Sequence, residues 1–140
     1  AYGIGSHRHN AEIQQELSYI KKSIEFTFTP HILPMFRGIL STIYLNYKSK
    51  ANLNKIYNEL RRFYMSHKFI KILKNKALST NDVINTNNCQ ISVCKSKDKK
   101  KLIILSSIDN LIKGGAGQAV QNLNLIFNFK LNEGLKWDTF

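Results

Sequence analysis

Residues 102–122 read LIILSSIDNLIKGGAGQAVQN and join strand, turn and helix patterns in one short stretch. The apolar run 102–105 predicts a fully buried β-strand. A glycine-rich turn then feeds a helix, because apolar side chains recur from there at the spacing of one helix face. These side chains are Ala116, Ala119, Val120, Leu123, Ile126 and Phe127. The stretch therefore predicts a fold that combines a sheet with helices.

The rest of the chain alternates between helix and strand patterns in the same way. Asn10 is the expected N-cap of an amphipathic helix that ends near Lys22, and the clearest apolar stripe predicts a packing helix over 53–64. Segment 74–88 is polar and turn-prone, and the lysines from 95 to 101 are expected at a solvated hairpin tip. Further strands are predicted at 23–30, 39–47, 69–73 and 89–93.

Length and composition indicate one globular domain. The chain has 140 residues, of which 43% are hydrophobic, enough for a core. No apolar run approaches the roughly 18 to 20 residues of a membrane span, and a signal-peptide pattern is lacking. The chain does not begin with Met and is expected to be a piece of a longer one. Cys89 and Cys94 match neither redox spacing nor a disulfide framework, which favours a reducing cytoplasm.

The formal net charge of +12 is typical of nucleic-acid-binding modules. However, seventeen of the 21 basic residues are lysines, and Lys, Ile and Asn are all abundant, as expected from A/T-rich codons. Tyr57, Phe63 and Tyr64 recur at helical core spacing, whereas proteins that bind single strands expose aromatic side chains on a groove or sheet. The composition therefore argues against dedicated nucleic-acid binding, which is kept as an alternative.

Two of the four histidines stand in GSHRHNAEI at residues 5–13. In an extended backbone His7 and His9 are expected to share a face, with Arg8 turned away. Histidine, with an ordinary pKa of about 6.5, can accept and donate a proton near neutrality, and an adjacent arginine suits an anionic substrate. Two surface histidines before a helix are the simpler alternative. Metal binding is disfavoured, because zinc needs more than two ligands and the other histidines are scattered.

Two further segments are candidates for ligand contacts. Arg37 lies in a loop stiffened by prolines, where it could clamp a carboxylate or phosphate, or simply lie exposed before a strand. Gly114 and Gly115 in the glycine-rich turn permit close approach of the backbone to a ligand or another domain. The turn is neither a Walker loop nor a dinucleotide fingerprint, and packing of the helix on the sheet is the alternative.

Three separated motifs fall in one order: HRHNAEIQQ at 7–15, FTPHILPMFRGI at 28–39 and IDNLIKGGAGQAVQNLN at 108–124. Together, over residues 2–127, they resemble the C-terminal half of the N-acetyl-γ-glutamyl-phosphate reductase family of arginine biosynthesis. The resemblance implies an NADPH-dependent reduction of an acyl phosphate to a semialdehyde with release of phosphate. In that family a cysteine in an N-terminal portion forms a thioester, and the same portion carries the dinucleotide-binding fold. This chain alone is therefore expected to be inactive.

The resemblance also implies a fold. It is an α+β domain with a mixed, largely antiparallel sheet and helices packed on one face, like the C-terminal catalytic and dimerisation domain of glyceraldehyde-phosphate-dehydrogenase-like enzymes. Residues 1–140 are expected to form one such domain, which works with its own N-terminal domain and with NADP held mainly there. An open sheet face with exposed apolar residues would support a homo-oligomer.

The same resemblance suggests site residues. His9 is similar to the family's acid/base, which helps to generate the thiolate and protonates the thiohemiacetal oxygen. His7 and Arg8 are implied on the substrate side, and Arg37 contacts an anion or holds its loop. Asn110 is similar to an amide residue at the nicotinamide end of the cofactor, with Gly114 and Gly115 as weaker neighbours. A related reductase acting on aminoadipyl phosphate in lysine biosynthesis, or a non-catalytic basic module, are the alternatives.

Overall fold

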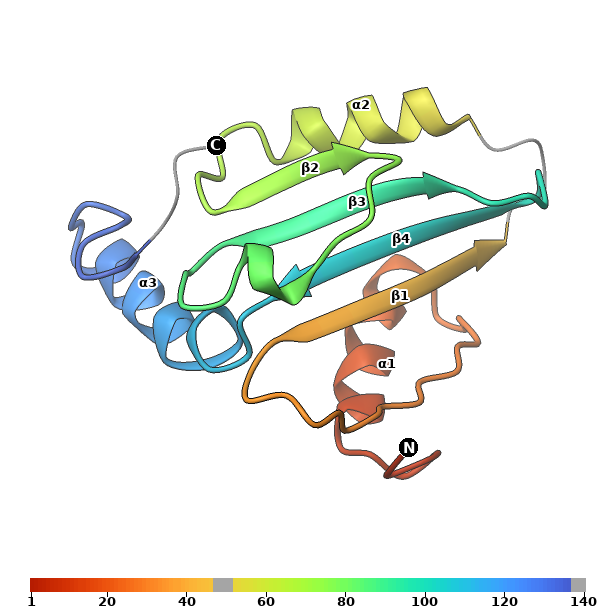
Figure 1. Cartoon of the computed structure of the whole chain (residues 1–140), viewed down its shortest axis with the longest axis horizontal. Coiled ribbons are helices and arrows are strands. Elements are labelled where there is room, and N and C mark those ends of the chain that lie inside the picture. The colour runs from red at the N-terminus through yellow and green to blue at the C-terminus, as the bar shows by residue number, and fades with distance from the viewer. Residues whose placement is uncertain (47–51, 137–140) are drawn as a thin grey trace. The chain divides into compact units, whose positions relative to one another are not determined.

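The computed structural model describes residues 1–46 and 52–136 and divides into two compact units, Ala1–Met35 and Phe36–Phe140. The first unit contains one helix and an extended segment, and the second contains the sheet. In chain order the elements are α1 (His9–Ile20), β1 (Ile39–Asn46), α2 (Leu53–Phe63), β2 (Ile70–Lys74), η1 (Thr80–Asp82), β3 (Cys89–Lys95), β4 (Lys101–Ile108), η2 (Ile112–Ala116) and α3 (Gly117–Ile126) (Figure 1). The expectation of a single domain stays a prediction.

Four strands form one mixed sheet in the order β1-β4-β3-β2 (Figure 1). β4 pairs antiparallel with both β1 and β3, whereas β2 pairs parallel with β3. The lysine-rich segment between β3 and β4 is the tip of their hairpin, as predicted. The mixed, largely antiparallel sheet expected from the sequence is therefore confirmed.

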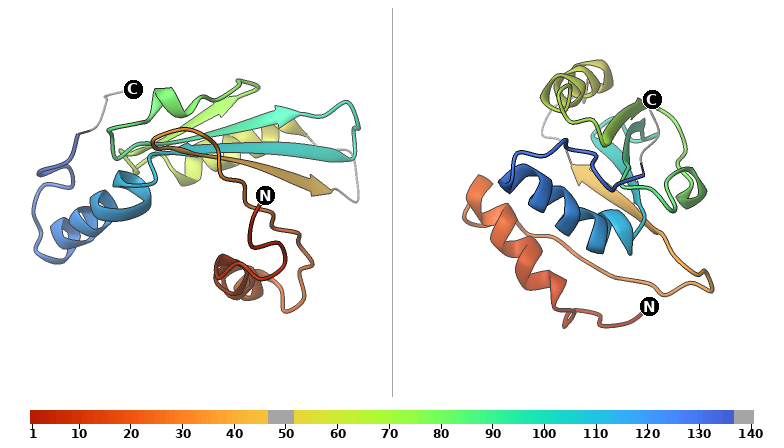
Figure 2. Two further views of the ribbon diagram at one scale, coloured as in Figure 1. Left: turned by 60° about the horizontal axis from the view of Figure 1, so that its bottom comes forward. Right: turned by 90° about the vertical axis from the view of Figure 1, so that its left-hand side faces the viewer.

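The apolar core lies between α2 and one face of the sheet. Asn52 caps α2 by accepting a hydrogen bond from the backbone N–H of Lys55 at 3.0 Å. Leu53, Val93 and Leu102 are buried against one another, and Ile56, Leu60 and Ile104 pack around them. Figure 2 shows α2 on one face of the sheet and the short 3₁₀ helix η1 on the other. The helix predicted over 53–64 is thus the helix that builds the core.

Three local predictions need correction. No strand forms over 23–30: Ile24, Phe26 and Phe28 are half-buried in the predicted alternation, but no strand of the described chain pairs with this segment. α1 begins at His9 after Arg8 rather than at an Asn10 cap. Within 102–105 only Leu102 is fully buried, because α2 packs mainly on β2 and β3.

One further expectation is wrong, because Phe63, which recurs at helical core spacing in the sequence, is 68% exposed. Both cysteines are free thiols. Among the described residues, no helix combines the length and hydropathy needed to span a bilayer. Tyr47, predicted at the end of a strand, lies outside the described residues.

Candidate functional site

One candidate site, within the unit Ala1–Met35, is the turn that leads into α1. Gly3 and Gly5 adopt positive φ angles of 55° and 71°. The backbone N–H of His7 donates to the carbonyl oxygen of Gly3 at 2.8 Å, and Arg8 is already in the helical region with φ −53° and ψ −34°. The histidine segment is therefore coiled and not extended, contrary to the prediction, because the helix starts two residues earlier than expected.

The two histidine rings nevertheless meet. The ring centroids of His7 and His9 are 4.6 Å apart in an edge-to-face arrangement, and Phe28 packs against His7 at 5.6 Å. Tyr2 contacts His7 edge-on at 5.2 Å. Both imidazoles are half-buried, whereas Arg8 is exposed. The structure thus brings His7 and His9 together, as predicted, and leaves Arg8 in solvent.

A hydrogen bond determines which nitrogen of His7 carries its proton. The backbone N–H of His9 donates to Nδ1 of His7 at 3.2 Å. A ring nitrogen that accepts has no proton, so neutral His7 holds its proton on Nε2. His9 itself is the first residue of α1, where the positive end of the helix dipole favours negative charge. This arrangement places an imidazole able to transfer a proton at a position that suits an anion.

The other two histidines lie elsewhere. His31 is exposed, with Nδ1 3.2 Å from the carbonyl oxygen of Thr29, and His67 stacks on Phe63 with ring centroids 6.2 Å apart. Across residues 1–46 and 52–136 no three His, Cys, Asp or Glu side chains gather as a set of metal ligands.

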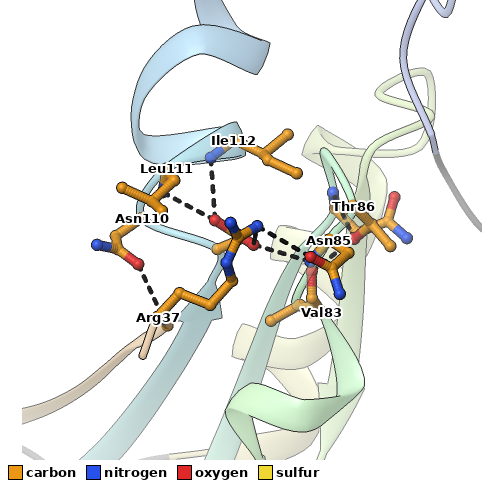
Figure 3. A network of polar contacts seen from close by, with 10 residues as sticks. Arg37, Val83, Asn85, Thr86, Asn110, Leu111 and Ile112 are labelled. Carbon is orange, nitrogen blue, oxygen red and sulfur yellow. Dashed lines mark hydrogen bonds and ion pairs between the residues drawn. The ribbon is translucent and has the colours of Figure 1, made fainter. Parts of the chain in front are cut away.

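A second candidate site, within the unit Phe36–Phe140, is the corner where β4 ends, centred on the fully buried carboxylate of Asp109. Its Oδ2 accepts hydrogen bonds from Arg37 Nη1 at 3.1 Å and from the backbone N–H of Asn85 at 2.8 Å. Its Oδ1 accepts from the backbone N–H groups of Leu111 at 2.8 Å and Ile112 at 3.0 Å (Figure 3). Three segments far apart in sequence are therefore tied to one carboxylate.

The environment keeps Asp109 ionised. Burial alone raises the pKa of a carboxyl group, but here the hydrogen bonds from the Asn85, Ile112 and Leu111 amides and from the Arg37 guanidinium outweigh it, so the pKa of Asp109 lies below its ordinary value. The ion pair with Arg37 compensates the buried charge. Asp109 is thus a fixed negative charge in the structure.

Asn110, next along the chain, is held by a separate contact. Its Oδ1 accepts a hydrogen bond from the backbone N–H of Gly38 at 2.7 Å. Gly38 has a φ of 109°, a conformation that few residues other than glycine adopt. Arg37 and Asn110, which were predicted separately, therefore belong to one corner of the sheet, joined through neighbouring residues.

The glycine-rich turn forms one π-helical turn, η2, that leads into α3. Gly115 breaks the helical geometry with φ −152° and ψ −114°. Both Gly114 and Gly115 are exposed, and an added Cβ on either would lie 3.3 Å from its nearest neighbour. The tightest position is Gly117, where a Cβ would lie 2.5 Å from Cγ2 of Ile112 and 2.6 Å from Oδ1 of Asn87.

Sequence reasoning missed two residues of this corner. Gly117 was passed over in favour of Gly114 and Gly115, although all three lie in the same turn. Asn85 was seen only as part of an Asn-rich turn, yet it has a φ of 63° and both its backbone N–H and its Oδ1 join the network. Asparagine tolerates a positive φ better than most residues. An asparagine in a turn-prone segment is therefore the sequence signal that could have indicated Asn85.

Lys113 and Cys89 are two further titratable residues close enough to influence each other electrostatically. Lys113 Nζ donates to Oε1 of Gln121 at 2.9 Å and lies 5.4 Å from the centroid of the Phe69 ring. Burial lowers the pKa of Lys113 and raises the pKa of the Cys89 thiol. A thiol held protonated by burial is a poor nucleophile, so Cys89 has a packing role here.

Residues 1–110 match the family of the semialdehyde dehydrogenase dimerisation domain. The N-acetyl-gamma-glutamyl-phosphate reductase of Clostridium botulinum strain Eklund 17B is 48% identical over 136 residues, which is 96% of this chain and 40% of that protein. The protein of the same name from Campylobacter jejuni subsp. doylei is 45% identical over 139 residues, 98% of this chain and 41% of that protein. The chain thus spans about two fifths of the curated relatives it matches.

Solved structures agree with the fold. Aspartate semialdehyde dehydrogenase II from Vibrio cholerae superposes with a TM-score of 0.53 at 16% identity, covering 69% of this chain and 29% of that one. The aspartate semialdehyde dehydrogenase from Francisella tularensis also gives a TM-score of 0.53 at 16% identity, over 68% and 28%. The expected α+β architecture, with its mixed sheet and packed helices, is therefore confirmed.

Proposed function

The chain belongs to the family of semialdehyde dehydrogenase dimerisation domains, and from this premise we propose that the protein containing it reduces N-acetyl-γ-glutamyl phosphate to N-acetylglutamate semialdehyde. The reaction uses NADPH, releases phosphate and belongs to arginine biosynthesis. The observation that carries this proposal is the similarity to reductases of that name over nearly the whole chain. The chain supplies one half of the site, and the dinucleotide-binding domain and the nucleophilic cysteine come from another segment of the protein.

His9 is the proton-transfer residue in this proposal. It accepts the proton of the nucleophilic thiol, so that a thiolate attacks the acyl carbon, and later returns a proton to the oxygen of the reduced carbon. The hydrogen bond from the backbone N–H of His9 orients the ring of His7, and the edge-to-face contact packs the His9 ring against it, which supports this role. His7 then orients the pair.

The substrate carries a phosphate and a carboxylate, so the residues of this chain that bind it need to stabilise negative charge. Arg8 is exposed next to the histidine pair and is assigned to the substrate side. The N-terminus of α1 adds partial positive charge at the same place. Arg37 was predicted to contact an anion or to hold its loop, and its ion pair with Asp109 favours the second role.

Asn110 is the residue proposed to meet the cofactor. When bound, NADPH supplies the hydride for the reduction. The corner fits a nicotinamide group, because Oδ1 of Asn110 already accepts from Gly38 and the amide nitrogen is left to donate to a carbonyl oxygen. The backbone of Gly114 and Gly115 is exposed beside it and forms the weaker part of this contact.

We further propose that the protein is a cytoplasmic homo-oligomer that associates through its sheet. β1 carries large exposed apolar side chains on both faces, with exposed fractions of 50% at Leu40, 44% at Ile43 and 68% at Tyr44. A contiguous exposed apolar surface commonly marks a protein interface. A Tyr44→Lys variant is expected to shift the protein toward smaller species in sedimentation, whereas unchanged assembly would place the interface elsewhere.

The experiment that tests the reaction uses a hybrid enzyme, in which this chain replaces the matching segment of the Clostridium botulinum reductase. The assay is phosphate-dependent oxidation of N-acetylglutamate semialdehyde with NADP⁺. We expect activity in the hybrid, and His9→Asn is expected to lower kcat about 10²- to 10⁴-fold.

His67→Asn is the matched control, because it removes an exposed imidazole that lies in the other unit. It is expected to leave kcat unchanged. An active hybrid in which His9→Asn behaves like His67→Asn would refute the acid/base assignment. A folded hybrid that oxidises only an aminoadipate semialdehyde would move the proposal to the lysine pathway.

A further inference from the structure

Two parallel contacts join the same two dipeptides. The side chain of Arg37 binds the carboxylate of Asp109, and the backbone of Gly38 binds the side chain of Asn110. The partners are 72 residues apart in each case. Because Arg37 and Gly38 are adjacent, and Asp109 and Asn110 are adjacent, the ion pair adds to the β1–β4 register in restraining the backbone N–H to which Asn110 binds.

This second contact determines the polarity of the Asn110 amide. A backbone N–H can only donate, so the amide atom 2.7 Å from Gly38 is the acceptor Oδ1. The Nδ2 group therefore points away from Gly38 (Figure 3). A ligand group that binds Nδ2 of Asn110 therefore has to be a hydrogen-bond acceptor.

The surroundings of Arg37 argue against a second use as an anion receptor. Its Nη1 is shared between Oδ2 of Asp109 and Oδ1 of Asn85, at 3.1 and 2.9 Å. Its guanidinium carbon lies 5.3 Å from the centroid of the Phe36 ring, and the side chain is 21% exposed. The fully buried carboxylate neutralises the charge that an incoming phosphate would need.

We propose that Arg37 and Asp109 are positioning residues that hold Asn110 as a hydrogen-bond donor toward the carboxamide oxygen of the nicotinamide. The inference rests on the proposed function, since that function brings the cofactor to this corner. It assigns Arg37 to the cofactor side of the reaction through Asn110, and removes it from direct contact with the phosphate of the substrate.

The test is a double-mutant cycle in the hybrid enzyme, with Arg37→Ala, Asn110→Ala and the double variant. NADPH affinity is measured by direct titration, and the KM for phosphate is measured in the oxidative direction. Each single variant is expected to weaken NADPH binding about three- to tenfold, the worth of one hydrogen bond. In the Asn110→Ala background, Arg37→Ala is expected to add no more than about a twofold further loss, because its effect passes through Asn110.

Arg62→Ala is the matched control, because Arg62 is an exposed arginine on α2 whose ion pair with Glu59 lies on the surface. It is expected to leave both constants unchanged. If Arg37→Ala unfolds the hybrid, as judged by circular dichroism, Asn110→Asp takes its place. Its carboxylate still accepts from Gly38 but cannot donate, so NADPH binding is expected to weaken at least about tenfold.

The outcomes separate the two claims. Effects of Arg37→Ala and Asn110→Ala that multiply in the double variant would reject the positioning role. So would an Arg37→Ala variant with normal NADPH affinity and a phosphate KM raised about tenfold, or an Asn110→Asp variant that binds NADPH normally. A folded hybrid without any NADP-dependent activity would reject the proposed function itself.

Discussion

The two candidate sites, one in each compact unit, are built in opposite ways. His7 and His9 are two residues apart, half-buried, and held by a ring contact and a hydrogen bond within one turn. Asp109 is fully buried, and its carboxylate joins partners 24 and 72 residues away as well as its own turn. The histidine pair can therefore change with little effect on the rest of the molecule, whereas the Asp109 corner cannot.

This difference separates chemistry from scaffolding. A residue that transfers protons needs access to its substrate, which a half-buried helix start provides. A residue that fixes a loop needs satisfied hydrogen bonds in a buried environment of low dielectric constant, where each hydrogen bond is stronger. Variants of the histidine pair are therefore expected to lose turnover, and variants of the Asp109 corner are expected to lose stability.

The largest stability effect is expected for Asp109→Ala. It leaves the guanidinium of Arg37 without its carboxylate and unpairs the backbone N–H groups of Asn85, Leu111 and Ile112. Breaking a buried ion pair from one side costs about 3–5 kcal/mol. Urea unfolding of the hybrid enzyme measures this loss, with Asp98→Ala at the exposed hairpin tip as control. If Asp109→Ala lost no more unfolding free energy than Asp98→Ala, the Asp109 corner would not be the structural anchor that this comparison assumes.

The helices and most strands were predictable because their signals are local. The stripe from Leu53 to Leu60 predicted α2, and the β-rich run that begins at Ile39 predicted β1. The segment 23–30 shows the limit of such signals: its side chains alternate in burial as predicted, but a strand also needs a partner, and partner choice is not written in the segment itself.

The same reasoning explains the candidate site. His7 and His9 could be paired from sequence because only one residue separates them, although the coiled turn brings them together rather than an extended backbone. The ion pair of Arg37 and Asp109 depends on the register of β1 against β4, which places Ile39 opposite Ile108. No local pattern contains that register, so Arg37 remained open between an anion contact and a loop contact.

A smaller loss is expected for Gly117→Ala, which tests packing beside the Asp109 corner. The new methyl group would lie 2.5 Å from Cγ2 of Ile112 and 2.8 Å from its carbonyl oxygen, so the start of α3 has to shift. Overpacking of this kind costs about 1–3 kcal/mol. The control is Gly114→Ala, whose new methyl group would lie 3.3 Å from its nearest neighbour. Gly134→Ala is unsuitable as a control, because Gly134 has a φ of 69°. Equal melting temperatures for the two variants would show that η2 and α3 shift to accommodate the methyl group without loss of stability.

The acid response of stability isolates the charge of Asp109. Its folded pKa is lowered, so its contribution is present above the unfolded pKa of about 3.9 and is lost as the pH falls through the folded pKa. One such proton changes the free energy of unfolding by at most about 1.4 kcal/mol per pH unit. Urea midpoints between about pH 5 and pH 2.5 should fall less steeply in Asp109→Asn than in the parent. Parallel curves would mean that this carboxylate does not govern the response.

The smallest stability effect is expected at His7. His7→Ala removes the acceptor at Nδ1, but the freed backbone N–H of His9 lies at the start of α1, where water replaces a lost partner at a cost of about 1 kcal/mol or less. His7→Asn offers a side-chain oxygen near the same place and should recover most of that loss. Turnover separates the two kinds of effect, because neither variant retains the ring that packs on His9. A lower kcat in both, with normal stability only in His7→Asn, would show that the ring orients His9; full activity in His7→Asn would mean that the hydrogen bond alone is enough.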